Sequence, residues 1–181
     1  MTGTSIAGRG VKQLIILRHA KSGWKNGALG DVDRPLSARG DRDAPRMGKR
    51  LLSRHARPDL LLASHAKRAQ RTAKLVARAL GVRPELIKTE ESLYLAEPAA
   101  VLAVVARQDD AYSCLLVVGH NPGLTDLANR LLPDLAIDNL PTAGVVAIDF
   151  AATIWKDVGG APAKLAYYDY PKNPELFVTE N

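Results

Sequence analysis

The stretch LIILRHAKSGW, residues 14–24, joins an apolar run directly to two reactive polar side chains. Four aliphatic residues are followed at once by Arg18 and His19. A continuous apolar run is typical of a strand that is covered on both faces, as in a parallel sheet. The junction therefore predicts a buried strand, at about residues 12–19, that ends on a guanidinium and an imidazole.

Further apolar runs follow along the chain and also end in polar residues. DLLLASH and SCLLVVGH are continuous and predict buried strands, whereas ELIKTEE is a weaker candidate. Two more strands are expected in the C-terminal part of the chain, at AGVVAIDF and AKLAYYD. In chain order these five runs occupy residues 59–65, 85–91, 113–120, 143–150 and 163–169.

Segments between these runs carry apolar residues at helical spacing. Helices are expected at residues 37–55 and 67–80, and a third from Pro98 onward. For the fourth, Asn121 is expected to be the N-cap and Pro122 the first helical residue. Strands that alternate with helices predict a three-layer α/β/α fold with a mostly parallel central sheet.

The composition is that of a globular domain and favours anionic partners. The chain has 181 residues, of which 46% are hydrophobic, and a net charge of +6. This length predicts a single domain, at residues 12–181, behind a flexible lead-in at residues 1–11. We expect no nucleic-acid partner, because aromatic residues make up only 5% and no basic strip is interleaved with them. No apolar stretch approaches the roughly 20 residues that span a bilayer, so no membrane partner is expected either.

The cysteine and histidine content argues against structural metal or disulfide chemistry. Cys114 is the only cysteine, so a disulfide or a thiolate zinc site cannot form within one chain, and a buried thiol is expected. No two histidines have helical metal-ligand spacing, and nearby arginines would repel a dication. We therefore expect no metal and no cofactor. The N-terminus lacks the apolar core of a signal peptide, which predicts a cytoplasmic protein.

The ends of the predicted strands carry the reactive side chains. Ligands of open α/β sheets bind outside the carboxyl ends of the strands, so these side chains should share one crevice. Arginines match phosphate oxygens, and a neutral histidine can attack phosphorus. A second histidine can hold the developing charge, and a carboxylic acid can protonate the leaving oxygen. The pattern predicts phosphoryl transfer by the following groups: Arg18-His19, Ser64-His65 with Arg68, Glu90-Glu91 and Gly119-His120-Asn121.

An ordered set of motifs covers most of the chain. It comprises LRHAKS, DRPLSARG (33–40), SHAKRAQRTA (64–73), EESLYLAEP (90–98), VVGHNPGL (117–124) and NLPTAG (139–144). The set resembles the histidine phosphatase superfamily, which has the phosphoglycerate mutase-like fold. Within that superfamily it is most similar to the SixA-type phosphohistidine phosphatase branch.

The resemblance implies a role for each matching position. His19 would accept the phosphoryl group, His120 would be the second pocket histidine, and Glu91 would be the proton donor, with Glu90 as its rival. The implied phosphate-binding residues are Arg18, Arg68, Arg34 and Asn121. Two positions depart from the pattern, because Ala20 replaces the usual glycine and His65-Ala66 stands where Ser-Pro is common. The role of His65 is open.

The resemblance also implies a substrate class. Larger members insert a cap domain, but only residues 92–112 separate the proton-donor strand from the second-histidine strand, so no cap domain is expected. An open site disfavours mutase chemistry, which must exclude water. We expect a metal-independent phosphatase that works through phospho-His19 on phosphohistidine proteins. The alternatives are a phosphatase for a small phosphorylated metabolite, such as a sugar phosphate or nucleotide, and a catalytically idle phosphate-binding module.

Overall fold

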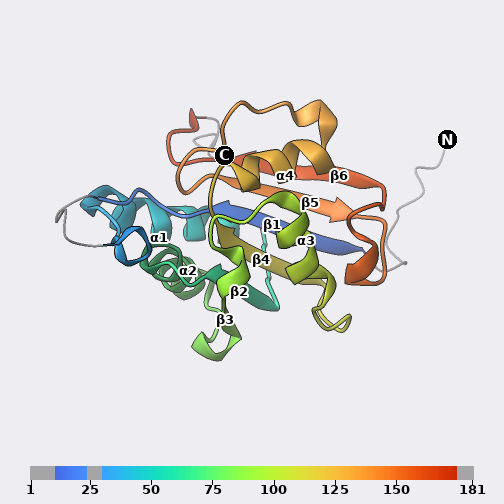
Figure 1. Ribbon diagram of the computed structural model, residues 1–181, viewed down its shortest axis with the longest axis horizontal. Coiled ribbons are helices and arrows are strands. Elements are labelled where there is room, and N and C mark those ends of the chain that lie inside the picture. The colour runs from blue at the N-terminus through green and yellow to red at the C-terminus, as the bar shows by residue number, and fades with distance from the viewer. Residues whose placement is uncertain (1–10, 24–29, 175–181) are drawn as a thin grey trace, which may run out of the picture.

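The computed structural model describes residues 11–23 and 30–174, and these form one layered α/β unit (Figure 1). Of the expected lead-in, only Val11 lies within the described residues. The strands are β1 (Lys12–Arg18), β2 (Leu60–Ser64), β3 (Ile87–Glu90), β4 (Cys114–Gly119), β5 (Val145–Phe150) and β6 (Ala163–Asp169). The helices are α1 (Ala38–Ser53), α2 (Lys67–Leu80), α3 (Pro98–Ala106) and α4 (Gly123–Leu131).

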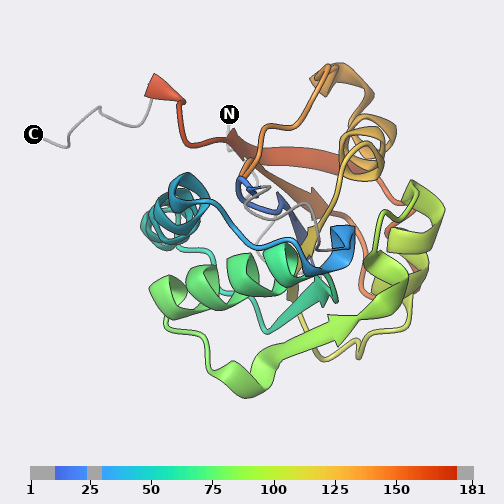
Figure 2. The same ribbon diagram turned by 60° about the vertical axis from the view of Figure 1, so that its left-hand side comes forward.

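The strands form one sheet in the order β3-β2-β4-β1-β5-β6. β1 lies inside it, parallel to β4 and antiparallel to β5. β2 is parallel to both β3 and β4, whereas β6 is antiparallel to β5. Turned by 60°, the molecule shows α1 and α2 on one face of the sheet and α3 and α4 on the other (Figure 2). The three-layer, mostly parallel architecture expected from the sequence is confirmed.

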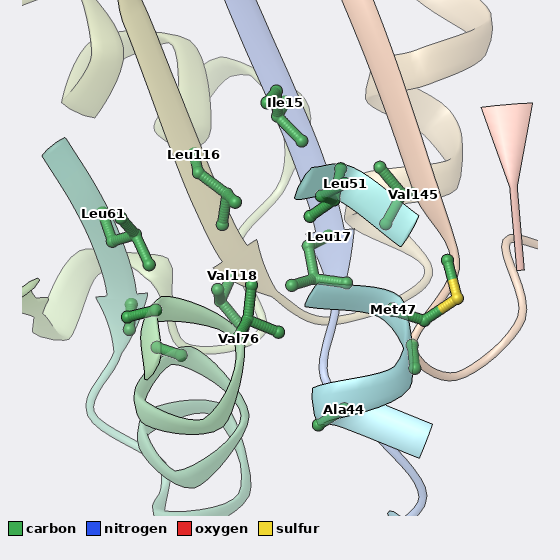
Figure 3. Packing of buried hydrophobic residues seen from close by; sticks show 14 of the residues in the cluster. Ile15, Leu17, Ala44, Met47, Leu51, Leu61, Val76, Leu116, Val118 and Val145 are labelled. Atoms are coloured by element: carbon green, nitrogen blue, oxygen red, sulfur yellow. The ribbon is translucent and has the colours of Figure 1, made fainter. Parts of the chain in front are cut away.

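Alternate residues of β1 enter two separate hydrophobic layers. Ile15 and Leu17 belong to the layer beneath α1 and α2, whose side chains Figure 3 shows. Leu14 and Ile16 belong to the layer beneath α3 and α4. All four side chains are fully buried, and each buried aliphatic side chain contributes about 2 kcal/mol of hydrophobic stabilisation. The end of β1, at Arg18, is therefore fixed firmly at the edge of the core.

The start of α4 differs from the sequence prediction. The helix begins at Gly123, and Pro122 occupies the N-cap position with no side-chain cap hydrogen bond. The prediction that Asn121 is the N-cap is wrong. Its amide nitrogen donates instead to the side chain of Asn139 (2.8 Å) and the carbonyl of Leu140 (3.0 Å). These bonds tie the end of β4 to the segment that leads into β5.

The segment between β3 and β4 is short. Residues 91–113 hold only η3, a 3-10 turn at Glu91–Leu93, and the nine-residue helix α3, so the expected absence of a cap domain is confirmed. Cys114, at the start of β4, is a buried free thiol, as expected, and burial raises its pKa to about 12. Within the described residues, no helix is both long and apolar enough to cross a bilayer.

Candidate active site

A pocket of about 450 Å³ opens beside the carboxyl end of β1 and contains most of the predicted site residues. Its walls come from the end of β1, the loop before α1, the first turn of α2 and the segments after η3, β4 and α4. A larger cavity of about 610 Å³ lies beside α2 and β3, but none of the predicted site residues lines it. The candidate site is therefore the smaller pocket, which is lined by Arg18, His19, Lys21, Ser22, Asp31, Arg34, Arg68, Leu95, Asn121 and Thr142.

His19 follows β1 directly and is only 7% exposed. Its Nδ1 lies 2.8 Å from the carbonyl oxygen of Ala20, so we assign the ring proton to Nδ1, which donates to that oxygen. Nε2 keeps its lone pair and accepts from Nε of Arg68 at 3.3 Å. Burial lowers the pKa of His19 to about 4, and the positive charges of Arg68 and Arg18 act in the same direction. The imidazole is therefore neutral at pH 7, with a lone pair facing the pocket arginine.

Arg68, the second residue of α2, is only 2% exposed and connects the site residues to one another. On the side of its guanidinium, Nε donates to His19 and Nη2 lies 3.4 Å from Nδ1 of His120. At the end of the guanidinium, Nη1 donates to the carbonyl of Asp31 (2.6 Å) and Nη2 to its carboxylate (2.9 Å). Arg68 therefore lines the pocket and is buried rather than solvated.

His120 follows β4, which is adjacent to β1 in the sheet, and its ring centre lies 5.1 Å from that of His19. Its Nε2 lies 2.8 Å from Oγ of Ser64, the last residue of β2. With Arg68 donating to Nδ1, the Nε2 proton is donated to Ser64. Burial lowers the pKa of His120 to about 3, and the nearby His19 and Arg68 add to the shift. Three neighbouring strands thus hold the two histidines and the serine in contact.

Arg18 and Asn121 are held by the same carbonyl group. Nη1 of Arg18 donates to the oxygen of Leu140 at 2.8 Å, and the amide of Asn121 donates to it at 3.0 Å. The backbone N–H of Ala143 donates to the carbonyls of Arg18 and His19. The segment before β5 therefore fixes the arginine and the asparagine at the pocket wall, where the sequence placed them.

Asp31 is the pocket carboxylate that the sequence reasoning missed. It begins η1, a 3-10 turn at Asp31–Asp33, and its Oδ1 lies 3.0 Å from Nη2 of Arg34. Its Oδ2 accepts from the hydroxyl of Tyr94 and from Arg68. The Tyr94 hydrogen bond and the arginines hold the pKa of Asp31 below its usual range. The only sequence signal was an opposite charge three residues before Arg34, a spacing at which side chains meet on a helical turn.

Neither predicted glutamate lies in the pocket. β3 is an edge strand, and β2 and β4 separate it from β1, so the carboxyl end of β3 is displaced from His19. Glu91 is exposed, and Glu90 forms an ion pair with Arg107. The expectation that Glu91 or Glu90 shares the crevice is wrong because of this edge position. Tyr94 returns to the site instead.

His65 lies next to the site without entering it. Its ring centre is 5.2 Å from that of Tyr94, which in turn packs edge-on against His120 at 5.4 Å. Among the described residues, no group of three or more His, Cys, Asp or Glu side chains is placed to hold a metal ion. The positive charge in the pocket comes from three arginines and from Lys21.

These groups are suited to transfer a phosphoryl group. Arg18, Arg34 and Arg68 present planar forks of donors, which match phosphate oxygens. Nε2 of His19 is an unprotonated nitrogen beside Arg68, and such a nitrogen can act as a nucleophile. The site therefore combines an anion cradle with a nucleophile on a rigid strand end.

Comparison with known proteins agrees with this chemistry. Residues 14–93 match the model of the histidine phosphatase superfamily (branch 1). An uncharacterised protein of Mycobacterium tuberculosis is 33% identical over 165 residues, which is 86% of this chain and all of that protein. Phosphoglycerate mutase 1 of Saccharomyces cerevisiae is 40% identical over 65 residues, 35% of this chain and 26% of that protein.

Solved structures extend the similarity to nearly the whole chain. A protein from Nakamurella multipartitia assigned as the phosphohistidine phosphatase SixA has a TM-score of 0.75 and 26% identity, over 91% of this chain and 98% of that one. The protein histidine phosphatase SixA in complex with tungstate shares the fold, with a TM-score of 0.74 and 20% identity over 88% and 97% of the chains. The chain belongs to the histidine phosphatase superfamily, and SixA phosphohistidine phosphatases are among its structural neighbours.

Proposed function

We propose that the protein is a metal-independent phosphatase that forms a phosphoenzyme at His19 and acts on phosphohistidine in proteins. The observation that carries the proposal is the orientation of His19. The Ala20 carbonyl fixes the proton on Nδ1, which leaves Nε2 unprotonated and accepting from Nε of Arg68. A nucleophile of this kind splits hydrolysis into two steps, transfer to the imidazole and then attack by water.

The arginines supply the charge that a metal supplies in other phosphatases. Arg68, Arg18 and Arg34 would bind the phosphoryl oxygens, and they would stabilise the charge that develops during transfer. Asn121 lines the same wall and would donate a further hydrogen bond. His120 would donate to a phosphoryl oxygen once its ring takes up or reorients a proton. The three arginines and Asn121 line the pocket, and His120 contacts Arg68.

The substrate class follows from the short connection between β3 and β4. Without a cap domain over the pocket, a side chain carried on another protein can reach His19. Leu95, at the rim, is 55% exposed and offers an apolar contact to such a partner. The similarity to SixA structures supports the same substrate class. We place this activity in a single domain at residues 12–181 and in the cytoplasm.

Parallel assays of wild type and His19→Ala test the proposal. In EDTA, wild type should hydrolyse para-nitrophenyl phosphate and phosphohistidine peptides, and His19→Ala should lose at least about 10³-fold in kcat/KM. Equal rates for the two proteins would overturn the phospho-His19 mechanism. A sugar phosphate or nucleotide with a much higher kcat/KM than the phosphohistidine peptide would overturn the substrate class alone.

A further inference from the structure

Asp31 occupies donors that a phosphoryl group needs. Its carbonyl and carboxylate accept from the two terminal nitrogens of Arg68, and the second carboxylate oxygen lies 3.0 Å from Arg34. The Asp31 side chain is 39% exposed, whereas that of Arg68 is 2% exposed. A phosphoryl group that binds both arginines must therefore displace the carboxylate, which has free space on its solvent side.

We propose that Asp31 is the proton-transferring carboxylate of the reaction, which the incoming phosphoryl group displaces from Arg68 and Arg34. The inference rests on the proposed function, because it requires a phosphoryl group bound beside His19. It assigns to Asp31 the role that the family resemblance gave to Glu91. Asp31 is the only carboxylate among the described residues that line the pocket.

The position of Asp31 along Arg68 suits this role. His19 and His120 contact the side of the guanidinium, whereas Asp31 contacts its end. A phosphoryl group bound to Arg68 would therefore have the nucleophile and the carboxylate on different sides. In-line displacement needs this arrangement, since the leaving atom departs opposite the attacking atom.

Displacement also changes the protonation of Asp31. In this structure, the hydroxyl of Tyr94 and the guanidinium of Arg68 stabilise the carboxylate and hold its pKa down. A phosphate dianion on Arg68 and Arg34 would remove these favourable charges and add a like charge, and both changes favour the neutral acid. Asp31 would then take up one proton from solvent as the substrate binds.

The two chemical steps balance with Asp31 as acid and then as base. Nε2 of His19 forms a bond to phosphorus, and the bond from phosphorus to the leaving atom breaks. That atom, the imidazole nitrogen of phosphohistidine or the oxygen of an aryl phosphate, takes the proton of Asp31. Water then attacks phospho-His19, the Asp31 carboxylate takes a water proton, and the nitrogen–phosphorus bond breaks. Phosphate leaves, Asp31 releases its proton to solvent and returns to Arg68.

A series of aryl phosphates with leaving groups of increasing basicity tests the proposal, with Asp31→Asn compared to wild type. General acids contribute about 10²-fold or more, so Asp31→Asn should lose that factor in kcat/KM for phenyl phosphate. For 2,4-dinitrophenyl phosphate, whose leaving oxygen needs no proton, the loss should stay below about threefold. An equal loss across the series would overturn the proposal and leave Asp31 a structural residue.

Asp33→Asn is the matched control, because Asp33 lies on the same 3-10 turn, pairs with Lys67 and does not line the pocket. Its leaving-group dependence should equal that of wild type. Asp31→Glu keeps a carboxyl group and should restore part of the activity on phenyl phosphate, which also guards against a folding defect in Asp31→Asn. No rescue by Asp31→Glu, together with a uniform loss in Asp31→Asn, would contradict the role.

Inhibition by inorganic phosphate gives a second readout. Asp31→Ala should bind inorganic phosphate more tightly than wild type, because no carboxylate competes for Arg68 and Arg34. Weaker binding would show that Asp31 builds the phosphate site instead of yielding it. His19→Ala separates this proposal from the proposed function: if His19→Ala is inactive while Asp31→Asn behaves as wild type, only the role of Asp31 fails.

Discussion

Two ion pairs of this protein each join an arginine to an aspartate, but their surroundings differ. Arg68 and Asp31 meet in the pocket, whereas Arg50, on α1, meets Asp169 at the end of β6, with nitrogen–oxygen distances of 2.9 and 3.0 Å. The Asp169 side chain is only 2% exposed, but that of Asp31 is 39% exposed. In both pairs the arginine is largely buried, so the exposure of the carboxylate is what distinguishes them.

The other hydrogen-bond partners of Arg50 and Arg68 also differ. Arg50 also donates to the backbone carbonyls of Tyr170 and Asn173, which fixes α1 to the chain after β6. Arg68 contacts two imidazole nitrogens, which are weak acceptors for a cation beside a pocket open to solvent. In this protein, a buried arginine is therefore structural when its acceptors are buried carbonyl and carboxylate oxygens. It is available to a ligand when one acceptor can move away.

The largest expected effect is on catalysis, at Arg68. Arg68→Lys keeps the charge but loses the planar fork and the Nε contact to His19, so kcat/KM for para-nitrophenyl phosphate should fall by about 10³-fold. Arg50→Lys is the matched variant at the other pair and should keep kcat/KM near wild type. Equal losses in the two variants would remove the distinction between the pairs.

The next effect is on stability, at Asp169. Asp169→Ala leaves Arg50 buried without its carboxylate, which should lower the free energy of unfolding by about 3 kcal/mol or more. Urea unfolding measures this change. Asp31→Ala should cost less, because water from the open pocket can take the place of its 39% exposed carboxylate on Arg68. A larger loss in Asp31→Ala than in Asp169→Ala would show that exposure does not separate the two pairs.

Acidification by one pH unit has a smaller expected effect on stability. The pKa values of His19 and His120 are about 4 and about 3, both below the ordinary value of 6.5. Between about pH 6.5 and 4 the unfolded chain therefore binds more protons than the folded chain. The free energy of unfolding should then fall on acidification by up to about 1.4 kcal/mol per pH unit for each histidine.

The pH dependence of stability is measured from melting temperatures between pH 4 and 7, which covers the range in which histidines titrate. The double variant His19→Gln, His120→Gln should flatten the curve. An unchanged slope in the double variant would contradict the burial of the two neutral rings.

The smallest effect is expected at the edge strand. Glu91→Gln should leave kcat/KM within about twofold of wild type and the stability within about 0.5 kcal/mol, because the side chain is exposed and outside the pocket. The same aryl phosphate series used for Asp31 measures the change. A loss confined to basic leaving groups would return the proton-donor role to Glu91.

The sheet and much of the site were predictable because burial leaves a clear sequence pattern. Continuous aliphatic runs mark strands covered on both faces, and the carboxyl ends of β1 and β4 bring Arg18, His19 and His120 together. Arg68 was placed correctly because it follows β2 within the first turn of α2. These predictions depend on regular elements whose ends have a fixed geometry.

The missed residues lie where regular geometry gives no guidance. Asp31 comes from the irregular segment between β1 and α1, of which residues 24–29 lie outside the described residues, and no periodicity shows which way a 3-10 turn points. Glu91 was placed in the crevice because it lies at the end of a predicted strand, whereas the sheet order puts β3 at the edge. Tyr94 directly follows η3, and its contact with Asp31, 63 residues earlier in the chain, depends on the tertiary fold.

Trapping the phosphoenzyme tests the central claim most directly. Wild type is mixed with a phosphohistidine peptide, quenched in base within one turnover, digested and sequenced by mass spectrometry under alkaline conditions, which preserve phosphohistidine. We expect one phosphorylated residue, His19, with labelling lost in His19→Ala and retained in the control variant His55→Ala, whose changed residue is exposed. Turnover without a phosphoenzyme, or phosphate on another residue, would contradict it.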